Sequence, residues 1–280
     1  MAAIASKRHR FNFRGSLSLP FVAFMVFFVV IPLLLIIFFA FTDASGNFSL
    51  QNWAEIFTSP EKWKTIGMTF LVAFATTIIC ILIAYPVAYI LSNKKFNKNK
   101  VLVYVFLLPM WVNFVVRTMA LKDMINVSFM KMFGFQLTAT QPLIGTIVGM
   151  VYDYLPFAIL PLYNQMLKMD KNQIEAAADL GANPVRVFYK VIIPMTVPGI
   201  VSACMMTFMP TMSSYVIAFH MSNGKIPIIG TLIEFYFSSG MGGYNSGAVL
   251  SLIMLIIIGI TLFAEKLTDK KDESRKAGIW

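Results

Sequence analysis

Long runs of residues without a single charge are the feature that most constrains this chain. Residues 19–41 form one such run of 23 residues, and residues 191–224 form another of 34. A helix that crosses a lipid bilayer needs about 20 mostly apolar residues. Hydrophobic residues make up 58% of the sequence and charged residues only 13%, which excludes a soluble enzyme or a disordered chain. The sequence therefore predicts an all-α integral membrane protein.

Six transmembrane helices are expected from the apolar runs and from the charged and turn-forming residues between them. They lie at about residues 19–41, 67–91, 101–120, 143–167, 194–219 and 246–264. One transmembrane domain then covers residues 19–264. A basic N-terminal segment (1–18) precedes it, and a C-terminal tail (265–280) follows it.

The lysines and arginines indicate how these helices are oriented. The N-terminal segment, the second and fourth connections and the C-terminal tail hold 17 of the 23 basic residues. Cytoplasmic loops of membrane proteins carry an excess of Lys and Arg, so we expect both termini to be cytoplasmic in a multi-pass protein of the plasma (inner) membrane. The net charge of +10 then faces anionic membrane lipid and requires no nucleic acid.

The connection between the fourth and fifth spans, residues 168–193, has an unusual composition. Asp170 can cap a helix that continues through Ala176 and Ala177, which are strong helix formers. Gly181 suits a helix end, and Pro184 suits the first position of a second short helix. The sequence predicts a helix, a glycine turn and a helix along the membrane face. A small helix of this kind is suited to dock into a groove of another protein.

The same loop resembles the EAA motif of permease subunits of binding-protein-dependent ABC importers. The family pattern is Glu-Ala-Ala, three residues, Gly, nine residues and Ile-x-Leu-Pro. This chain has the same spacing from Glu175 through Gly181 to Pro194, with Val191 in place of Ile and Ile193 in place of Leu.

The resemblance implies a type I importer permease (MetI-like) fold whose cytoplasmic loop couples to an ABC ATPase. The ATPase-coupling residues that it implies are Glu175, Ala176, Ala177, Asp179, Leu180 and Gly181. It further implies a second homologous permease subunit and an extracytoplasmic binding protein as partners. ATP and Mg would be bound by the partner ATPase, and this chain would hold no cofactor.

Within that family, the chain resembles the spermidine/putrescine permeases from the first span to the sixth. The resemblance is carried by residues 50–53, 109–117, 152–157, 161–163, 214–219 and 228–234. It implies that the chain forms half of the pathway of an ATP-driven polyamine importer, with polyamine as the substrate.

The sequence offers little for catalysis. The dipeptide Gly224-Lys225 has neither the upstream glycine nor the following Ser or Thr of a P-loop. His9 and His220 have no Ser, Cys or carboxylate at the spacing of a catalytic triad or metal site. With two His and two Cys in all, a metal site is not expected. We therefore expect a non-catalytic subunit of an ATP-hydrolysing transport complex.

Candidates for the substrate pathway are few because the spans contain few charges. Asp153 lies about ten residues into the fourth span, where a carboxylate must face a cavity or a partner. It could contact a cationic substrate, or it could form a buried pair with Arg117. The other candidates are Trp111, Asn113, Tyr152, Tyr154, Tyr215 and Glu234, most of which offer ring faces or acceptors to an ammonium ion.

Two alternatives to a polyamine importer remain open from the sequence. An ABC permease of this kind could carry another small solute, such as a metal-anion complex, thiamine or an amino acid. A secondary transporter would work without ATP, but the EAA-like loop and the lack of an evident inverted repeat argue against it. Uptake that depends on ATP while the proton gradient is held constant would separate these classes.

Overall fold

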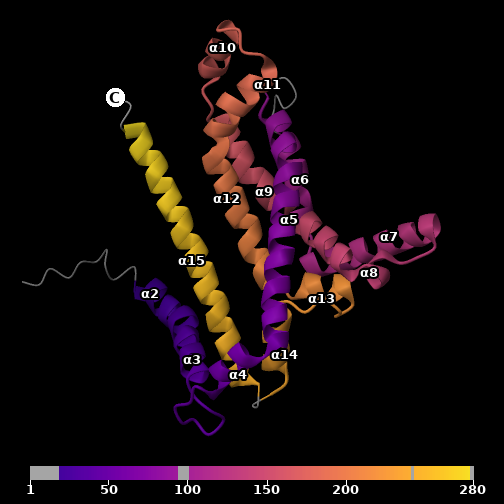
Figure 1. Ribbon diagram of the computed structural model, residues 1–280, viewed down its shortest axis with the longest axis vertical. Coiled ribbons are helices and arrows are strands. Elements are labelled where there is room, and N and C mark those ends of the chain that lie inside the picture. The colour runs from indigo at the N-terminus through magenta and orange to yellow at the C-terminus, as the bar shows by residue number, and fades with distance from the viewer. Residues whose placement is uncertain (1–18, 94–100, 241–242, 278–280) are drawn as a thin grey trace, which may run out of the picture.

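A computed structural model describes residues 19–93, 101–240 and 243–277, which form a bundle of helices (Figure 1). Apart from one isolated β-bridge between Thr42 and Phe48, their regular structure is helical. The long helices run roughly along the longest axis of the molecule, with α10 at one end and α4 and α14 at the other. We call these the α10 end and the distal end. The predicted all-α fold is confirmed.

Five helices are long and apolar enough to cross a membrane, and the number rises to six when a pair of helices joined by a sharp bend is counted as one span. The first span consists of α2 (Leu19–Met25), a π-helical turn η1 (Val26–Val30) and α3 (Ile31–Ala40), and the second is α5 (Pro60–Ser92). In the bent pair, α6 (Val101–Leu107) and η2 (Leu108–Trp111) lie before the bend and α7 (Phe114–Phe133) after it. The remaining spans are α9 (Pro142–Leu167); α11 (Pro184–Val187) with η3 (Phe188–Ile192) and α12 (Ile193–Ser213); and α15 (Tyr244–Ala277). The shorter helices are α4 (Gln51–Thr58), α8 (Leu137–Thr140), α10 (Lys171–Asp179), α13 (Val216–Ser222) and α14 (Ile229–Ser238).

The third span is broken, so the prediction of a continuous helix over residues 101–120 is wrong. η2 ends at Trp111, and α7 leaves at an angle of 95° to form the arm that projects from the bundle in Figure 1. Pro109 has no N–H with which to continue the helical ladder, and Val112 is extended (φ −81°, ψ 140°). Asn113 then caps α7, because its side-chain oxygen accepts hydrogen bonds from two backbone N–H groups of the first turn.

The fifth span also differs from its predicted range of 194–219. It begins earlier, at Pro184, and α12 ends at Ser213. Ser214 is extended (φ −70°, ψ 115°), and α13 starts as a separate short helix. The Ser213 hydroxyl lies 3.2 Å from the carbonyl oxygen of Pro210 and donates to it, so a side chain competes for the backbone acceptors of the last turn.

The core of the bundle lies between α5, α9 and α12. Its buried cluster nearest the α10 end combines small side chains (Cys80, Ala84, Ala88, Ala158 and Ala203) with larger ones such as Ile159, Leu162 and Met166. Small residues allow membrane helices to approach closely. The buried hydroxyls of Thr69, Thr207 and Thr211 donate to the carbonyl oxygen four residues earlier, which satisfies these polar groups away from water.

The first span is anchored mainly at its distal end. α3 packs against α15, and Ala40 is the one buried residue described in α2, η1 and α3. The Trp53 indole donates to the Ala40 carbonyl oxygen (2.9 Å), and the Asn245 side-chain amide donates to the carbonyl oxygens of Phe39 (3.0 Å) and Thr42 (2.6 Å). Apart from the half-buried Ile36, the rest of the span exposes its large apolar side chains.

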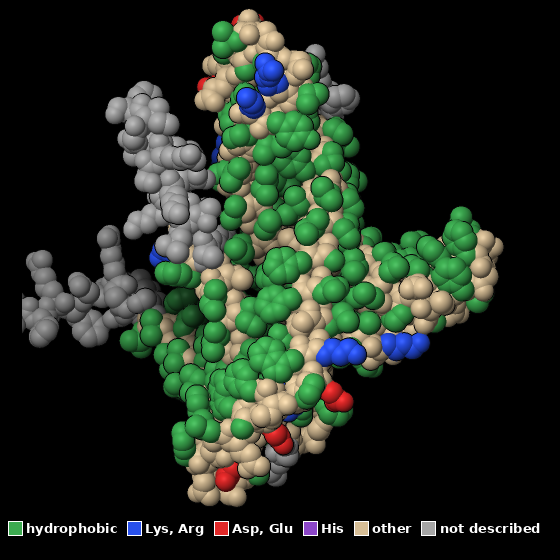
Figure 2. Space-filling view, viewed as in Figure 1, with side chains coloured by type: hydrophobic (Ala, Val, Ile, Leu, Met, Phe, Trp, Pro, Cys, Tyr) green, Lys and Arg blue, Asp and Glu red, His purple; other side chains and the backbone are tan. Residues whose placement is uncertain are grey.

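The surface agrees with a membrane protein. Figure 2 shows hydrophobic side chains over the middle of the visible face, and Lys, Arg, Asp and Glu toward the two ends and along the lower edge of the projecting arm. An apolar band bounded by charged ends matches a bilayer that covers the middle of the bundle.

Gly230 brings α14 against the end of α12. A Cβ atom built on Gly230 would lie 2.7 Å from the carbonyl oxygen of Ser213, which is backbone and cannot turn aside. We expect Gly230→Ala to destabilise the purified protein by about 1–3 kcal/mol, measured as a lower unfolding temperature in detergent. Gly67→Ala is the control, because no described atom lies within 4 Å of that added Cβ and alanine favours helix. Equal unfolding temperatures for the two variants would contradict the prediction.

Candidate functional site

The loop between α9 and α11 has the helix, glycine turn and helix that the sequence predicted. The Asp170 carboxylate accepts a hydrogen bond from the backbone N–H two residues later (3.0 Å) and caps α10. Gly181 follows the end of α10 with φ +79°, a left-handed conformation that glycine adopts without steric cost. The Asn183 side-chain oxygen accepts from the backbone N–H of Arg186 (2.8 Å) and caps α11.

This loop lies at one end of the molecule (Figure 1), and it exposes large apolar side chains. Leu180 is 89% exposed, and Val185 and Tyr189 are also exposed. Of the other predicted coupling residues, Glu175, Ala176, Asp179 and Gly181 are exposed and Ala177 is half-buried. Exposed large apolar side chains along this loop indicate a contact surface for another protein.

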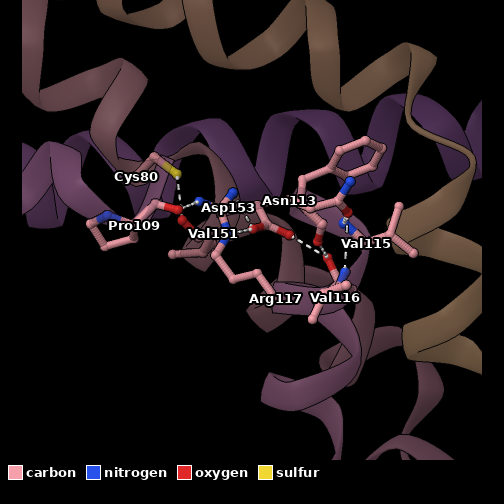
Figure 3. Close-up of polar contacts among 10 residues, drawn as sticks. Cys80, Pro109, Asn113, Val115, Val116, Arg117, Val151 and Asp153 are labelled. Atoms are coloured by element: carbon pink, nitrogen blue, oxygen red, sulfur yellow. Dashed lines mark hydrogen bonds and ion pairs between the residues drawn. The ribbon is translucent and has the colours of Figure 1, made fainter. Parts of the chain in front are cut away.

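A buried ionic network lies where the third span breaks (Figure 3). Nε and Nη2 of Arg117 lie 2.6 and 2.5 Å from Oδ1 of Asp153, and the Thr118 hydroxyl donates to Oδ2 (2.7 Å). Nη1 of Arg117 donates to the carbonyl oxygen of Pro109 (2.5 Å). Arg117 therefore ties the end of η2, the start of α7 and the middle of α9 together.

The network bears on the two roles that the sequence left open for Asp153. The pair with Arg117 is present, the side chain of Asp153 is 2% exposed, and both of its oxygens are occupied by protein donors. The negative charge of a buried carboxylate paired in this way is already balanced by the guanidinium group. Contact between Asp153 and a substrate stays a prediction, and it would require the carboxylate to leave these donors.

The candidates around the break have different surroundings. Trp111 is 85% exposed at the end of η2, and the Asn113 side chain is used as the helix cap. The Tyr152 ring centre lies 5.7 Å from the Arg117 guanidinium, so a protein cation already occupies this ring. The Tyr154 hydroxyl donates to the carbonyl oxygen of Pro210 (3.2 Å) and thereby joins α9 to α12.

The last two candidates, Tyr215 and Glu234, line one cavity between α13 and α14 at the distal end. We call it the distal aromatic cavity; it is also lined by Val216, Phe219, His220, Thr231 and Phe235. The sequence alone did not predict that these residues line a common cavity. The available signal was helical spacing, since positions four apart share a face: Tyr215 with Phe219, and Thr231 with Phe235.

Comparisons with known proteins agree with this architecture. The family model for the binding-protein-dependent transport system inner membrane component matches residues 81–269. The spermidine/putrescine transport system permease protein PotB of Haemophilus influenzae is 31% identical over 271 residues, 90% of this chain and 93% of the relative. PotB of Escherichia coli K12 is 30% identical over 270 residues, 90% of this chain and 98% of the relative.

Among solved structures, the chain is similar to one in the crystal structure of a bacterial ABC transporter involved in the import of the acidic polysaccharide alginate. The TM-score is 0.71, with 13% sequence identity over 90% of this chain and 94% of that chain. At this identity the likeness concerns the fold. The matched family model and the full-length relatives show that the chain belongs to the inner membrane components of binding-protein-dependent transport systems, and is a multi-pass permease.

Proposed function

We propose that this chain is a transmembrane permease subunit of an ATP-driven importer of polyamines such as spermidine and putrescine. The observation that carries the proposal is identity of about 30% along nearly the whole length of permeases named for these two substrates. Such a match covers the spans, the loop with Glu175 and the distal segments together, and is not confined to one motif.

In this proposal the α10 end faces the cytoplasm and receives the ATPase. The exposed Leu180 would enter an apolar groove of that partner, the small Ala176 and Ala177 would let α10 approach closely, and Glu175 would face basic or polar groups. ATP and Mg would be bound and used by the ATPase, so the chain itself would be non-catalytic.

The distal end then faces outward, where an extracytoplasmic binding protein delivers the polyamine. A second permease subunit would complete the pathway, and the large apolar side chains exposed along the first span and α7 would face that subunit or lipid. Each permease would contribute half of the lining. ATP-driven changes at the α10 end would alternately open the two ends of this path.

The test is uptake by cells that lack their own polyamine importers and express the complete complex. We expect accumulation of labelled spermidine or putrescine that stops when ATP is depleted and the proton gradient is held constant. Leu180→Asp should reduce uptake by about tenfold or more, because a carboxylate cannot enter an apolar docking groove. Uptake that follows the proton gradient would contradict ATP coupling, and uptake of another solute alone would contradict the substrate.

A further inference from the structure

The distal aromatic cavity has the composition of a site for an organic cation. Its volume is about 290 Å³, near the lower end of the range for small-ligand pockets. Tyr215, Phe219 and Phe235 supply three aromatic rings, and Glu234 supplies a carboxylate. Ring faces and a carboxylate are the groups that attract alkylammonium ions.

The charge of this cavity distinguishes it from two other cavities, one at the distal end and one on α7. These two combine an acid with lysines: Glu61 with Lys62, Lys64 and Lys225 in one, and Asp123 with Lys122 and Lys131 in the other. Among the described residues, no Lys or Arg lines the distal aromatic cavity, and His220 is its one titratable base. Its lining is therefore net negative when the imidazole is neutral, and a cation would meet attraction without a competing ammonium group.

The Glu234 carboxylate is available for such a ligand. It accepts one hydrogen bond, from the Ser238 hydroxyl (3.0 Å), and it forms no ion pair with any of the described residues. Asp153 is the opposite case, because it is buried and held by Arg117. A carboxylate that retains free acceptor positions beside aromatic rings can bind a cation without breaking an existing pair.

We infer that the distal aromatic cavity binds one ammonium group of a polyamine near the outer mouth of the permease. The inference rests on the proposed function and gives the substrate a defined contact in this chain. Glu234 would bind the ammonium group through charge-assisted hydrogen bonds, and the rings of Phe219 and Phe235 would line the adjoining methylene chain. The remainder of the linear substrate would extend out of the cavity toward the partner subunit.

Thiol labelling tests the cation site without requiring transport. Val216→Cys places a nearly isosteric thiol in the cavity lining; Cys80 and Cys204, both free, are replaced by Ala. In membranes carrying the complete complex, the reagents are a trimethylammonium-ethyl methanethiosulfonate and the neutral methyl methanethiosulfonate. We expect Glu234→Gln to lower the ratio of cationic to neutral labelling rates about threefold to tenfold. Spermidine should protect the thiol while Glu234 is present.

Transport gives the second measurement. At subsaturating spermidine, Glu234→Gln should lower the uptake rate about threefold to tenfold. The control is Glu61→Gln, an exposed carboxylate at the same end whose cavity contains three lysines, and we expect it to leave uptake unchanged. Equal effects of the two variants on uptake would overturn the inference.

The two measurements separate this inference from the proposed function. If the complex imports spermidine but Glu234→Gln does not change the ratio of cationic to neutral labelling rates, the cavity assignment is overturned and the proposed polyamine importer is retained. A complex that imports no polyamine but shows labelling dependent on Glu234 and blocked by spermidine would retain the cation site and overturn the importer. Labelling that spermidine does not slow would overturn the cavity assignment.

Discussion

Asp153→Asn should destabilise the assembled transporter by about 3–5 kcal/mol, because Arg117 would stay buried without its counter-ion. Arg117 also holds the carbonyl oxygen of Pro109, so the bend between η2 and α7 should loosen as well. The measurement is the unfolding temperature of the detergent-purified complex, together with the yield of assembled subunits. Asp123→Asn is the matched control, since Asp123 is exposed on α7 and forms no ion pair in the described part of the chain.

The double variant Asp153→Asn with Arg117→Gln distinguishes a structural pair from a substrate contact. Removal of both charges leaves no unpaired ion, so most of the lost stability should return. If Asp153 instead contacts the substrate, the single variant should assemble normally but take up less polyamine. The double variant should then show equally low polyamine uptake. An Asp153→Asn complex with unchanged stability and unchanged uptake would contradict both roles.

Gly181→Val should uncouple the ATPase from transport, with a loss of about 30-fold in polyamine-stimulated ATP hydrolysis. Among the described residues, none lies within 4 Å of a Cβ built there, but φ is +79°. The substitution therefore strains the turn and adds bulk where the proposed partner docks. Glu175→Lys tests the same surface by charge reversal without straining the backbone.

Gly134→Val is the matched control for the coupling variants. Gly134 ends α7 with φ +75° and open space around its Cβ position, so it should suffer the same backbone strain on the projecting arm, away from the α10 loop. Stimulated hydrolysis is expected to persist in Gly134→Val and to fail in the coupling variants. If all three variants behave alike, the α10 loop is not the docking element.

The fold could be predicted wherever the signal is local. The cap at Asp170, the turn at Gly181 and the proline that opens α11 each carry their own backbone chemistry, and the structure contains all three. The break near Asn113 was missed because an apolar run is averaged over many residues, while a helix stop depends on a single extended residue, Val112. The end of α12 was missed for the same reason.

The site was predictable residue by residue but not as a set of contacts. The possible pair of Arg117 and Asp153 could be named because an isolated charge in a span needs a partner. Thr118 and the Pro109 carbonyl complete that network through a bend that the sequence did not reveal. Tyr215 and Glu234 were separate candidates, since only the turn between α13 and α14 brings them to one cavity.

The anchorage of the first span has a mechanical consequence. Its 22 residues form a helix about 33 Å long. The side chains of Trp53 and Asn245 hold one end of it by donating hydrogen bonds to backbone carbonyl oxygens there. Lipid tails are as apolar as its leucines, so burial alone does not fix its angle. A tilt of roughly 10° about this pivot moves the free end by about 6 Å over that length. The first span can therefore pivot about contacts made within this chain, while its tilt angle is set by the lipid or protein that surrounds its free end.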